Sequence, residues 1–274
     1  MNPLRIYLYD EPRAPTLRID EIRDYVADRL PAAEVVARES FVDFRVSSLA
    51  REARDLAIQS LGEKMARAKV RNLSVPSFSF PPLPGEIDYE RRRLTDPHSK
   101  VFGLMYDGVR LATTFEDLLP AEEATNDHIH VVFTNQLIGT WDADDRRYHA
   151  RVGVYSYPSI LSTTGLVEAP AKPRRFYQFK QQYAALGMYD AAAVLKRDFQ
   201  GRFIDHNDER ITEAMKGYVM QAIFYHLTGD PFCQDVNCRL YNAHWQEEVI
   251  RAQLDGEYEY CPTHEEMLRR GIVH

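Results

Sequence analysis

The sequence has few cysteines, no long apolar run and no excess of basic residues. Only three of its 274 residues are cysteine, so at most one disulfide can form and one thiol would stay unpaired. No apolar run approaches the roughly 20 residues of a membrane-spanning helix, and nothing at the N-terminus resembles a secretion signal. Lys and Arg number 34 against 41 Asp and Glu, a net charge of −7. We therefore expect a soluble, cytoplasmic protein that binds neither nucleic acid nor membrane.

All three cysteines lie in one C-terminal stretch, in the pattern Cys233-x4-Cys238-x22-Cys261-x2-His264. Two close pairs separated by a helix-sized insert are typical of tetrahedral zinc sites. A Cys3His set fills all four positions and leaves none for a reacting water. The pattern thus predicts one structural Zn²⁺ per chain with these four residues as its ligands. The alternative is a partly buried group of inert thiols, because cysteine is common in protein cores.

Hydrophobic patterns predict an alternation of strands and helices in the first half of the chain. We expect strands at residues 4–9 and 34–37, separated by a helix at residues 16–30 with Thr16 as its N-cap. A strand–helix–strand opening predicts a parallel pair. Residues 128–134 are apolar enough to predict a strand in the centre of a sheet.

Prolines interrupt the pattern between these segments. A charged helix is expected from about residue 47 to residue 70, followed by a stretch with four prolines at residues 72–87. We expect that stretch to be a loop or a lid, since proline disrupts a regular helix. Further strands are expected at residues 148–157 and 160–166.

The strongest helical pattern lies at residues 208–228 and is ended by Gly229. The predicted fold class is therefore α/β. We expect an α/β domain at residues 1–230, which contains the proline-rich loop, and a zinc-stapled subdomain at residues 231–274.

The segment around this helix resembles the archaemetzincins, which are zinc metallopeptidases of the metzincin clan. Their active-site helix carries H-E-x-x-H-x-x-G-x-x-H-C, followed by x4-C-x-M and a later C-x-x-C. The matching positions here are His226, Gly229, Cys233, Cys238 and the pair Cys261 and His264. The resemblance covers residues 208–268 and implies a metzincin-like mixed sheet with flanking helices. The sequence is also similar to an uncharacterised family described as metallopeptidases.

The departures from the motif remove its chemistry. In this register, Ala222 and Ile223 replace the first histidine and the glutamate base, and Phe232 replaces the third histidine. Leu240 stands where the family has the methionine of its turn. A metzincin needs all three histidines to hold zinc and the glutamate to move a proton. The HExxH motif is thus degenerate, and we expect no classical peptidase activity.

The remaining histidines allow an alternative. His226 lies on an apolar helix face, where a packed core histidine is the simplest interpretation. His128 and His130 are two apart on a strand, so both point to one face, a spacing that suits a metal. These three are the candidates for a rebuilt catalytic site. Asp142 and Asp145 lie in a polar turn without the glycine and bidentate glutamate of a calcium loop.

Two classes of function follow from this reasoning. One is a zinc-binding, non-proteolytic metallopeptidase homologue, a pseudoenzyme that binds a peptide or protein partner in the former substrate cleft. The other is a metal-dependent hydrolase whose site is rebuilt from His226, His128 and His130. A count of bound metals separates them, since the first requires one zinc and the second requires two metals. The sequence does not specify the ligand or the oligomeric state.

Overall fold

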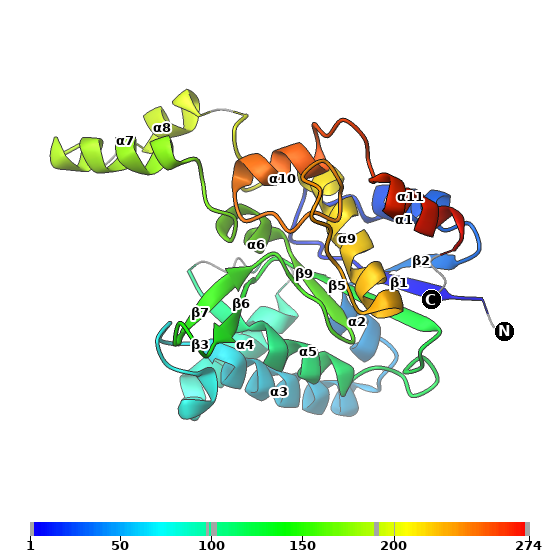
Figure 1. The fold of residues 1–274 in the computed structure, drawn as a ribbon. Helices are drawn as coiled ribbons and strands as arrows, with labels where there is room; N and C mark the ends of the chain where they lie inside the picture. Colours follow the sequence, from blue (N-terminus) through cyan, green and yellow to red (C-terminus); the bar gives the residue numbers. More distant parts are fainter. Residues whose placement is uncertain (1–2, 97–98, 100–102, 189–191, 200, 272–274) are drawn as a thin grey trace.

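Two mixed β-sheets form the centre of the fold (Figure 1). The structure is a computed structural model, and it describes residues 3–96, 99, 103–188, 192–199 and 201–271. The larger sheet has the order β2-β1-β5-β9-β8. Its strands are β1 (Arg5–Tyr9), β2 (Glu34–Arg38), β5 (His128–Thr134), β8 (Gly153–Val154) and β9 (Ser159–Ser162). The first four in spatial order are parallel, and β8 runs antiparallel to β9 at the edge. The predicted α/β class, the parallel opening and the central position of β5 are confirmed.

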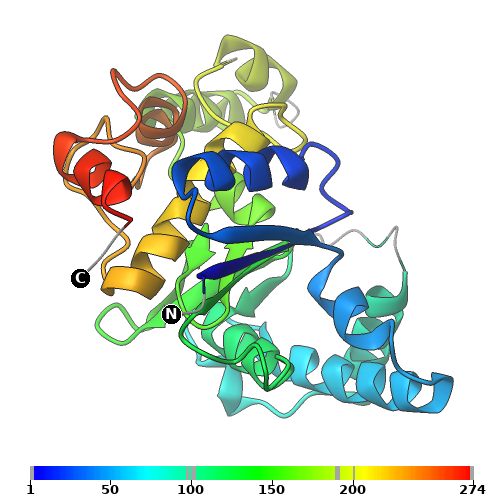
Figure 2. The same ribbon diagram turned by 90° about the vertical axis from the view of Figure 1, so that its right-hand side faces the viewer.

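Helices cover both faces of this sheet, because side chains along each strand alternate between the faces. On one face, Ile6 and Leu8 of β1 share a buried cluster with α1 (Ile19–Arg29) and α9 (Ile211–Thr228). On the other face, Tyr7 and Tyr9 pack with helices from residues 41–119. These are α2 (Phe41–Val46), α3 (Arg51–Ala68) and α5 (Gly108–Glu116). Figure 2 shows α1 and α3 on opposite sides of the sheet.

The smaller sheet has the order β3-β4-β6-β7. Its strands are β3 (Lys69–Val70), β4 (Met105–Asp107), β6 (Leu137–Asp142) and β7 (Arg147–Arg151). A buried ionic cluster joins it to α4 (Pro84–Thr95): the Glu90 carboxylate lies 2.9 Å from Lys69 Nζ and 2.8 Å from Arg93 Nε. Tyr106 Oη also donates to Glu90, at 2.7 Å. Glu90 is fully buried, so these three donors compensate for its lost hydration.

Three local expectations need correction. Thr16 does not cap α1; Arg18 occupies the N-cap position and makes no side-chain cap bond. Residues 72–87 are not all loop, since they hold the 3₁₀ turn η1 (Ser77–Ser79) and the start of α4 at Pro84. Proline is well tolerated in the first helical turn, where its missing N–H costs no hydrogen bond. The strand expected at residues 160–166 ends at Ser162, whose side chain caps α6 (Thr163–Glu168).

The proline-rich stretch is fastened to the smaller sheet and does not lie over a cleft as a lid. Tyr148 donates its backbone N–H to Leu73 O at 2.8 Å, and its hydroxyl accepts from the backbone N–H of Ser77 at 2.9 Å. Ser77 Oγ donates to Asp107 at 2.9 Å. The stretch therefore serves as a support for β4 and β7.

The C-terminal third contributes helices to the same face as α9. They are α10 (Gln246–Gln253) and α11 (Pro262–Arg269), whereas α7 (Arg174–Ala185) and α8 (Ala192–Asp198) extend away from the sheets in Figure 1. Leu240, Val249 and Leu268 belong to the same buried cluster as α9. Residues 231–271 thus share their core with the preceding chain, and the division at residue 230 stays a prediction. In the described part of the chain, none of the helices has the length and apolarity needed to cross a membrane.

Candidate functional site

The four residues of the cysteine–histidine pattern converge beside the C-terminal end of α9. Cys233 and Cys238 lie on the loop that follows Gly229, which caps α9 with a positive φ of 79°. This loop closes on itself, because Cys233 N donates to Leu240 O at 2.9 Å and Cys238 N donates to Asp235 O at 3.0 Å. Cys261 is the N-cap of α11, so His264 falls in the first turn of that helix.

The donor atoms have the spacing of a tetrahedral site. All four ligand atoms lie within 4.8 Å of one another. Cys233 Sγ is 3.8 Å from Cys261 Sγ, and Cys238 Sγ is 3.7 Å from His264 Nδ1. A zinc–sulfur bond of about 2.3 Å gives a tetrahedral edge of roughly 3.8 Å. Cys261 Sγ and His264 Nδ1 are closer, at 3.1 Å. The group is therefore a potential metal-binding site, and its soft donors suit zinc.

Burial shifts the pKa values of three of the four groups towards their neutral forms. Burial raises the pKa of the Cys238 thiol to about 12, and burial also raises the pKa of Cys233. Burial lowers the pKa of His264, which keeps its imidazole neutral and able to ligate. A buried thiol with a high pKa loses its proton readily only when a metal ion takes its place. Phe224 of α9 packs edge-on against the His264 ring at 5.3 Å, so the site is joined to the helix.

The two strand histidines lie on the far side of the sheet from α9. Their rings pack against Tyr7, with centroids 5.8 Å away for His128 and 5.1 Å for His130. Both ring nitrogens of His130 are engaged: Nε2 donates to Glu123 O at 3.1 Å, and Nδ1 lies 3.0 Å from Tyr9 Oη. Burial lowers the pKa of His130 to about 4, so its ring is neutral at physiological pH.

His226 is half-buried at the end of α9 and is not a core residue. Its Nε2 atom lies 2.9 Å from the backbone carbonyl of Asn126, and its ring packs against Tyr157 at 5.8 Å. Tyr157 also packs edge-on against His130, with ring centroids 5.6 Å apart. The structure therefore does not bring His226, His128 and His130 together around one point. Among the described residues, the groups with metal-ligand spacing do not include them.

The remaining positions of the expected motif carry no ligating atoms. Ala222, Ile223 and Leu240 are fully buried in the core beside α1 and the sheet. Phe232 contacts Tyr155 edge-on, with ring centroids 5.7 Å apart. In the register expected from the sequence, these four positions therefore offer only hydrocarbon side chains.

A pocket of about 320 Å³ lies next to these residues. One wall comes from β7, β8 and Tyr155, the floor from α9, and the far wall from residues 169–170 after α6 and residues 241–244 after the loop that carries Cys233 and Cys238. The far segments are joined, since Ala171 N donates to His244 O and Gln246 N donates to Ala171 O, both at 2.8 Å. The lining residues include Arg151, Gly153, Tyr155, Tyr218, Gln221, Phe232, Asn242 and His244.

Hydrogen bonds fix the pocket floor. The Tyr155 hydroxyl donates to Gln221 Oε1, and Gln221 Nε2 lies 3.1 Å from Tyr241 O. Gln221 is 1% exposed, so its amide is held in one orientation. Tyr218, one turn earlier, is 5% exposed, and its hydroxyl has no hydrogen-bond partner in the described part of the chain. A buried hydroxyl without a partner is costly and marks a place where a ligand can supply one.

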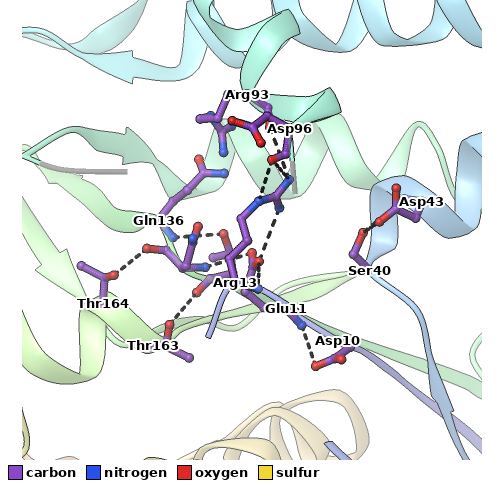
Figure 3. Close-up of polar contacts among 12 residues, drawn as sticks. Asp10, Glu11, Arg13, Ser40, Asp43, Arg93, Asp96, Gln136, Thr163 and Thr164 are labelled. Carbon is purple, nitrogen blue, oxygen red and sulfur yellow. Dashed lines mark hydrogen bonds and ion pairs between the residues drawn. The ribbon is translucent and has the colours of Figure 1, made fainter. Parts of the chain in front are cut away.

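The carboxyl ends of the parallel strands, where α/β proteins often bind ligands, are filled by internal hydrogen bonds (Figure 3). Glu11 is buried after β1 and accepts from the backbone of Asn135, after β5, at 3.1 Å. Arg13 donates to Arg93 O at 3.3 Å and to Asp96 O at 3.1 Å. These contacts fasten the loops after β1 and β5 to α4, which is a structural role.

A second group with metal-ligand spacing lies in the turn between β6 and β7. Asp142, Asp145 and His149 have ligand atoms within 4.8 Å of one another. His149 Nε2 lies 2.9 Å from Asp145 Oδ2, a contact that is an ion pair only when the imidazole is protonated. Asp142 Oδ1 accepts from the backbone of Asp144 and Asp145, at 2.9 and 3.0 Å. These two hydrogen bonds are those of an Asx turn, which gives the Asp142 carboxylate a structural role in the β6–β7 turn.

Sequence reasoning missed Tyr218 and Gln221 as pocket residues. A signal was present, since Gln221 is a polar residue in the middle of an otherwise apolar helix. Buried polar side chains in such positions need partners and often define a site.

A comparison with known families places the chain. The family described as "Probable metallopeptidase family (DUF6775)" matches residues 2–271. No curated protein and no solved structure matches the chain significantly. The family description specifies neither the metal ligands nor a relation to archaemetzincins, and that resemblance stays a prediction. Because the match covers nearly the whole chain, the protein belongs to the Probable metallopeptidase family (DUF6775).

Proposed function

We propose that this protein is a zinc-stapled metallopeptidase homologue that binds peptides without cleaving them. In this proposal one Zn²⁺, held by Cys233, Cys238, Cys261 and His264, has a structural role. Four protein donors would fill a tetrahedral zinc site, so no position is left for a reacting water. The zinc would anchor the wall of the pocket that follows α9.

The single observation that carries the proposal is the composition of the pocket. Its lining contains no aspartate, no glutamate and no cysteine, and His244 is its one histidine. Hydrolysis of a peptide needs a general base together with a metal or another activated nucleophile. One exposed histidine does not supply these groups, whereas the pocket volume falls in the range of about 300–1,000 Å³ that is typical of ligand sites.

The edge of the larger sheet supports a peptide as the ligand. Strand β8 is the outermost strand, and no described strand pairs with its outer side. Val152 O accepts from Ser162 N of β9 at 2.7 Å. Along an antiparallel strand, residues that hydrogen-bond to the neighbouring strand alternate with residues whose backbone groups point outward. Val152 is hydrogen-bonded to β9, so the N–H and C=O of the next residue, Gly153, point away from β9. Gly153 also lines the pocket. An extended peptide can add to such an edge and place one side chain or its terminus in the pocket.

The test is affinity selection of a synthetic octapeptide library on the full-length, zinc-loaded protein, with mass spectrometry of the retained peptides. Asn242 is exposed and lines the pocket, so Asn242→Trp should fill it without loss of stability. Gln181→Trp, at an exposed position on α7, is the matched control. We expect the wild type and Gln181→Trp to retain peptides intact, and Asn242→Trp to retain at least tenfold less. No retention by the wild type, or equal retention by Asn242→Trp, would refute peptide binding in this pocket.

A further inference from the structure

We infer that the pocket recognises a carboxylate, which Arg151 and the hydroxyl of Tyr218 bind together. This inference rests on the proposed peptide-binding function and names the chemical group that the peptide places in the pocket. Two sources are possible for that group: the C-terminus of a peptide, or the side chain of an aspartate or glutamate.

The charge of the lining is the first support. Arg151 is the one permanently charged side chain among the residues that line the pocket. The chain as a whole has more acidic than basic residues, 41 against 34, yet none of the acidic ones lines this pocket. Because no carboxylate lines the pocket with Arg151, its positive charge attracts a ligand group with a negative charge.

Arg151 has hydrogen-bonding capacity to spare. Its Nε atom donates to Thr140 Oγ1 at 2.8 Å, which fixes the side chain along the sheet. Within the described residues, no carboxylate oxygen lies within the 4.0 Å of an ion pair with this guanidinium. The terminal nitrogens therefore remain for a ligand. A guanidinium held by its Nε can present its other N–H groups to a carboxylate in the planar geometry that this pair prefers.

Tyr218 is the second, independent support. It lines the same pocket from the α9 side, it is 5% exposed, and its hydroxyl lacks a partner among the described residues. Its neighbours do not satisfy it, because the Tyr155 hydroxyl donates to Gln221 instead. Burial raises the pKa of Tyr218, so it carries its proton and can donate to an acceptor. A carboxylate oxygen is the strongest acceptor that a peptide offers.

Four pools of synthetic octapeptides test the inference on the full-length, zinc-loaded protein. The first pool has free C-termini and no acidic residues, and the second has the same sequences with amidated C-termini. The third is amidated with one Asp or Glu at each position in turn, and the fourth carries Asn or Gln at those positions. We expect at least a tenfold preference for the first pool over the second, or for the third over the fourth. One charge-assisted interaction gives a factor of about 10–100.

Two variants assign the preference to the named residues. Arg151→Gln should abolish it, whereas Arg147→Gln, on an exposed residue of the same strand, should leave it unchanged. Tyr218→Phe should reduce it several-fold with no loss of thermal stability, since the hydroxyl has no partner to lose. A residue with only a structural role would show the opposite pattern, a loss of stability without a change in preference.

The outcomes separate the inference from the proposed function. Retention of peptides without any preference for a carboxylate would overturn the inference and leave peptide binding intact. If no pool is retained, titration with N-acetylglycine, followed by amide shifts of Gly153, decides the matter. Saturation that Arg151→Gln abolishes would support the carboxylate site and refute peptide binding. No saturation, or saturation that this variant leaves unchanged, would overturn the inference.

Discussion

Cys238 Sγ lies 3.7 Å from Nδ1 of His264, although the two residues are 26 positions apart in the sequence. Cys238 is fully buried, and burial raises the pKa of its thiol. A neutral thiol and a neutral imidazole form only a weak hydrogen bond, whereas the Zn²⁺ proposed above would bind both groups. In that proposal the metal joins the loop after α9 to the start of α11.

The first prediction concerns removal of one ligand. Cys238→Ser should lower the zinc content from one ion per chain to well below one, and it should lower the melting temperature by at least about 10 °C. The physical reason is that structural zinc contributes its binding free energy to folding. Elemental analysis and thermal unfolding check both parts. His149→Gln, in the group of the β6–β7 turn, is the matched control and should keep the full zinc content.

An extension of this test uses proteolysis. Because residues after 230 are held by the proposed zinc, a chelator should expose that segment to protease before the sheets unfold. A protein purified without chelator that contains no zinc would contradict the assignment of all four ligands.

The second prediction is the absence of zinc-dependent peptidase activity. The protein should leave every member of a peptide library uncleaved, with or without added Zn²⁺, because in the metzincin register expected from the sequence Ala222 and Ile223 replace a ligand and the general base. Mass spectrometry of the incubated library is the measurement. Cleavage that a chelator stops and that His226→Gln abolishes would show instead that this histidine serves a catalytic metal. The His226→Gln variant separates the protein's own activity from that of a contaminating protease.

The sequence predicted those features that depend on local patterns. The pattern of apolar residues predicts the strands at residues 5–9 and 128–134, and both are confirmed. The end of α9 at Gly229 is also confirmed, because glycine readily adopts the positive φ of a helix C-cap. Residues 163–166 belong to the strand expected at residues 160–166, and β-branched threonines are compatible with extended structure. The Ser162 hydroxyl accepts from Gly165 N at 2.7 Å, and this cap starts a helix instead.

The sites depend on contacts that no local pattern contains. His128 and His130 share a strand face as expected, but only the sheet topology decides that α9 covers the opposite face. The pocket combines segments near residues 151, 218, 232 and 242, which are far apart in the chain. The cysteine–histidine pattern could be found from sequence because each of its two pairs is local, and a pair of such pairs is a recognisable signature.

The third prediction is a pH dependence of stability that originates from His130. Burial lowers the pKa of this imidazole from 6.5 to about 4 in the folded protein, where Arg38, Glu123, Tyr9 and His128 surround it. The unfolded chain therefore binds a proton below pH 6.5 that the folded protein does not bind until about pH 4. Stability is thus complete above pH 6.5 and falls as the pH is lowered through this window, by about 3 kcal/mol from this residue.

Urea unfolding at pH 7.5 and pH 4.5 measures this effect. His130→Gln should be less stable at pH 7.5, because it loses the packing against Tyr7, but its stability should fall less on acidification. Acidic conditions also protonate zinc ligands, and comparison with the wild type removes that common contribution. Equal losses in the two proteins would contradict the prediction.

The last prediction uses two glycines to isolate the backbone requirement at the end of α9. Gly229 has a φ of +79°, and nothing lies within 4 Å of the position that a Cβ would take. Gly229→Ala should therefore destabilise the protein by about 1–2 kcal/mol through left-handed backbone strain alone. Gly85, in the first turn of α4, has equally open surroundings without a positive φ. Gly85→Ala should be neutral or stabilising by up to about 1 kcal/mol, because it reduces the freedom of the unfolded chain. Denaturant unfolding of the two zinc-loaded variants measures the difference. If both substitutions have the same effect, the left-handed cap is not what turns the chain from α9 into the cysteine loop.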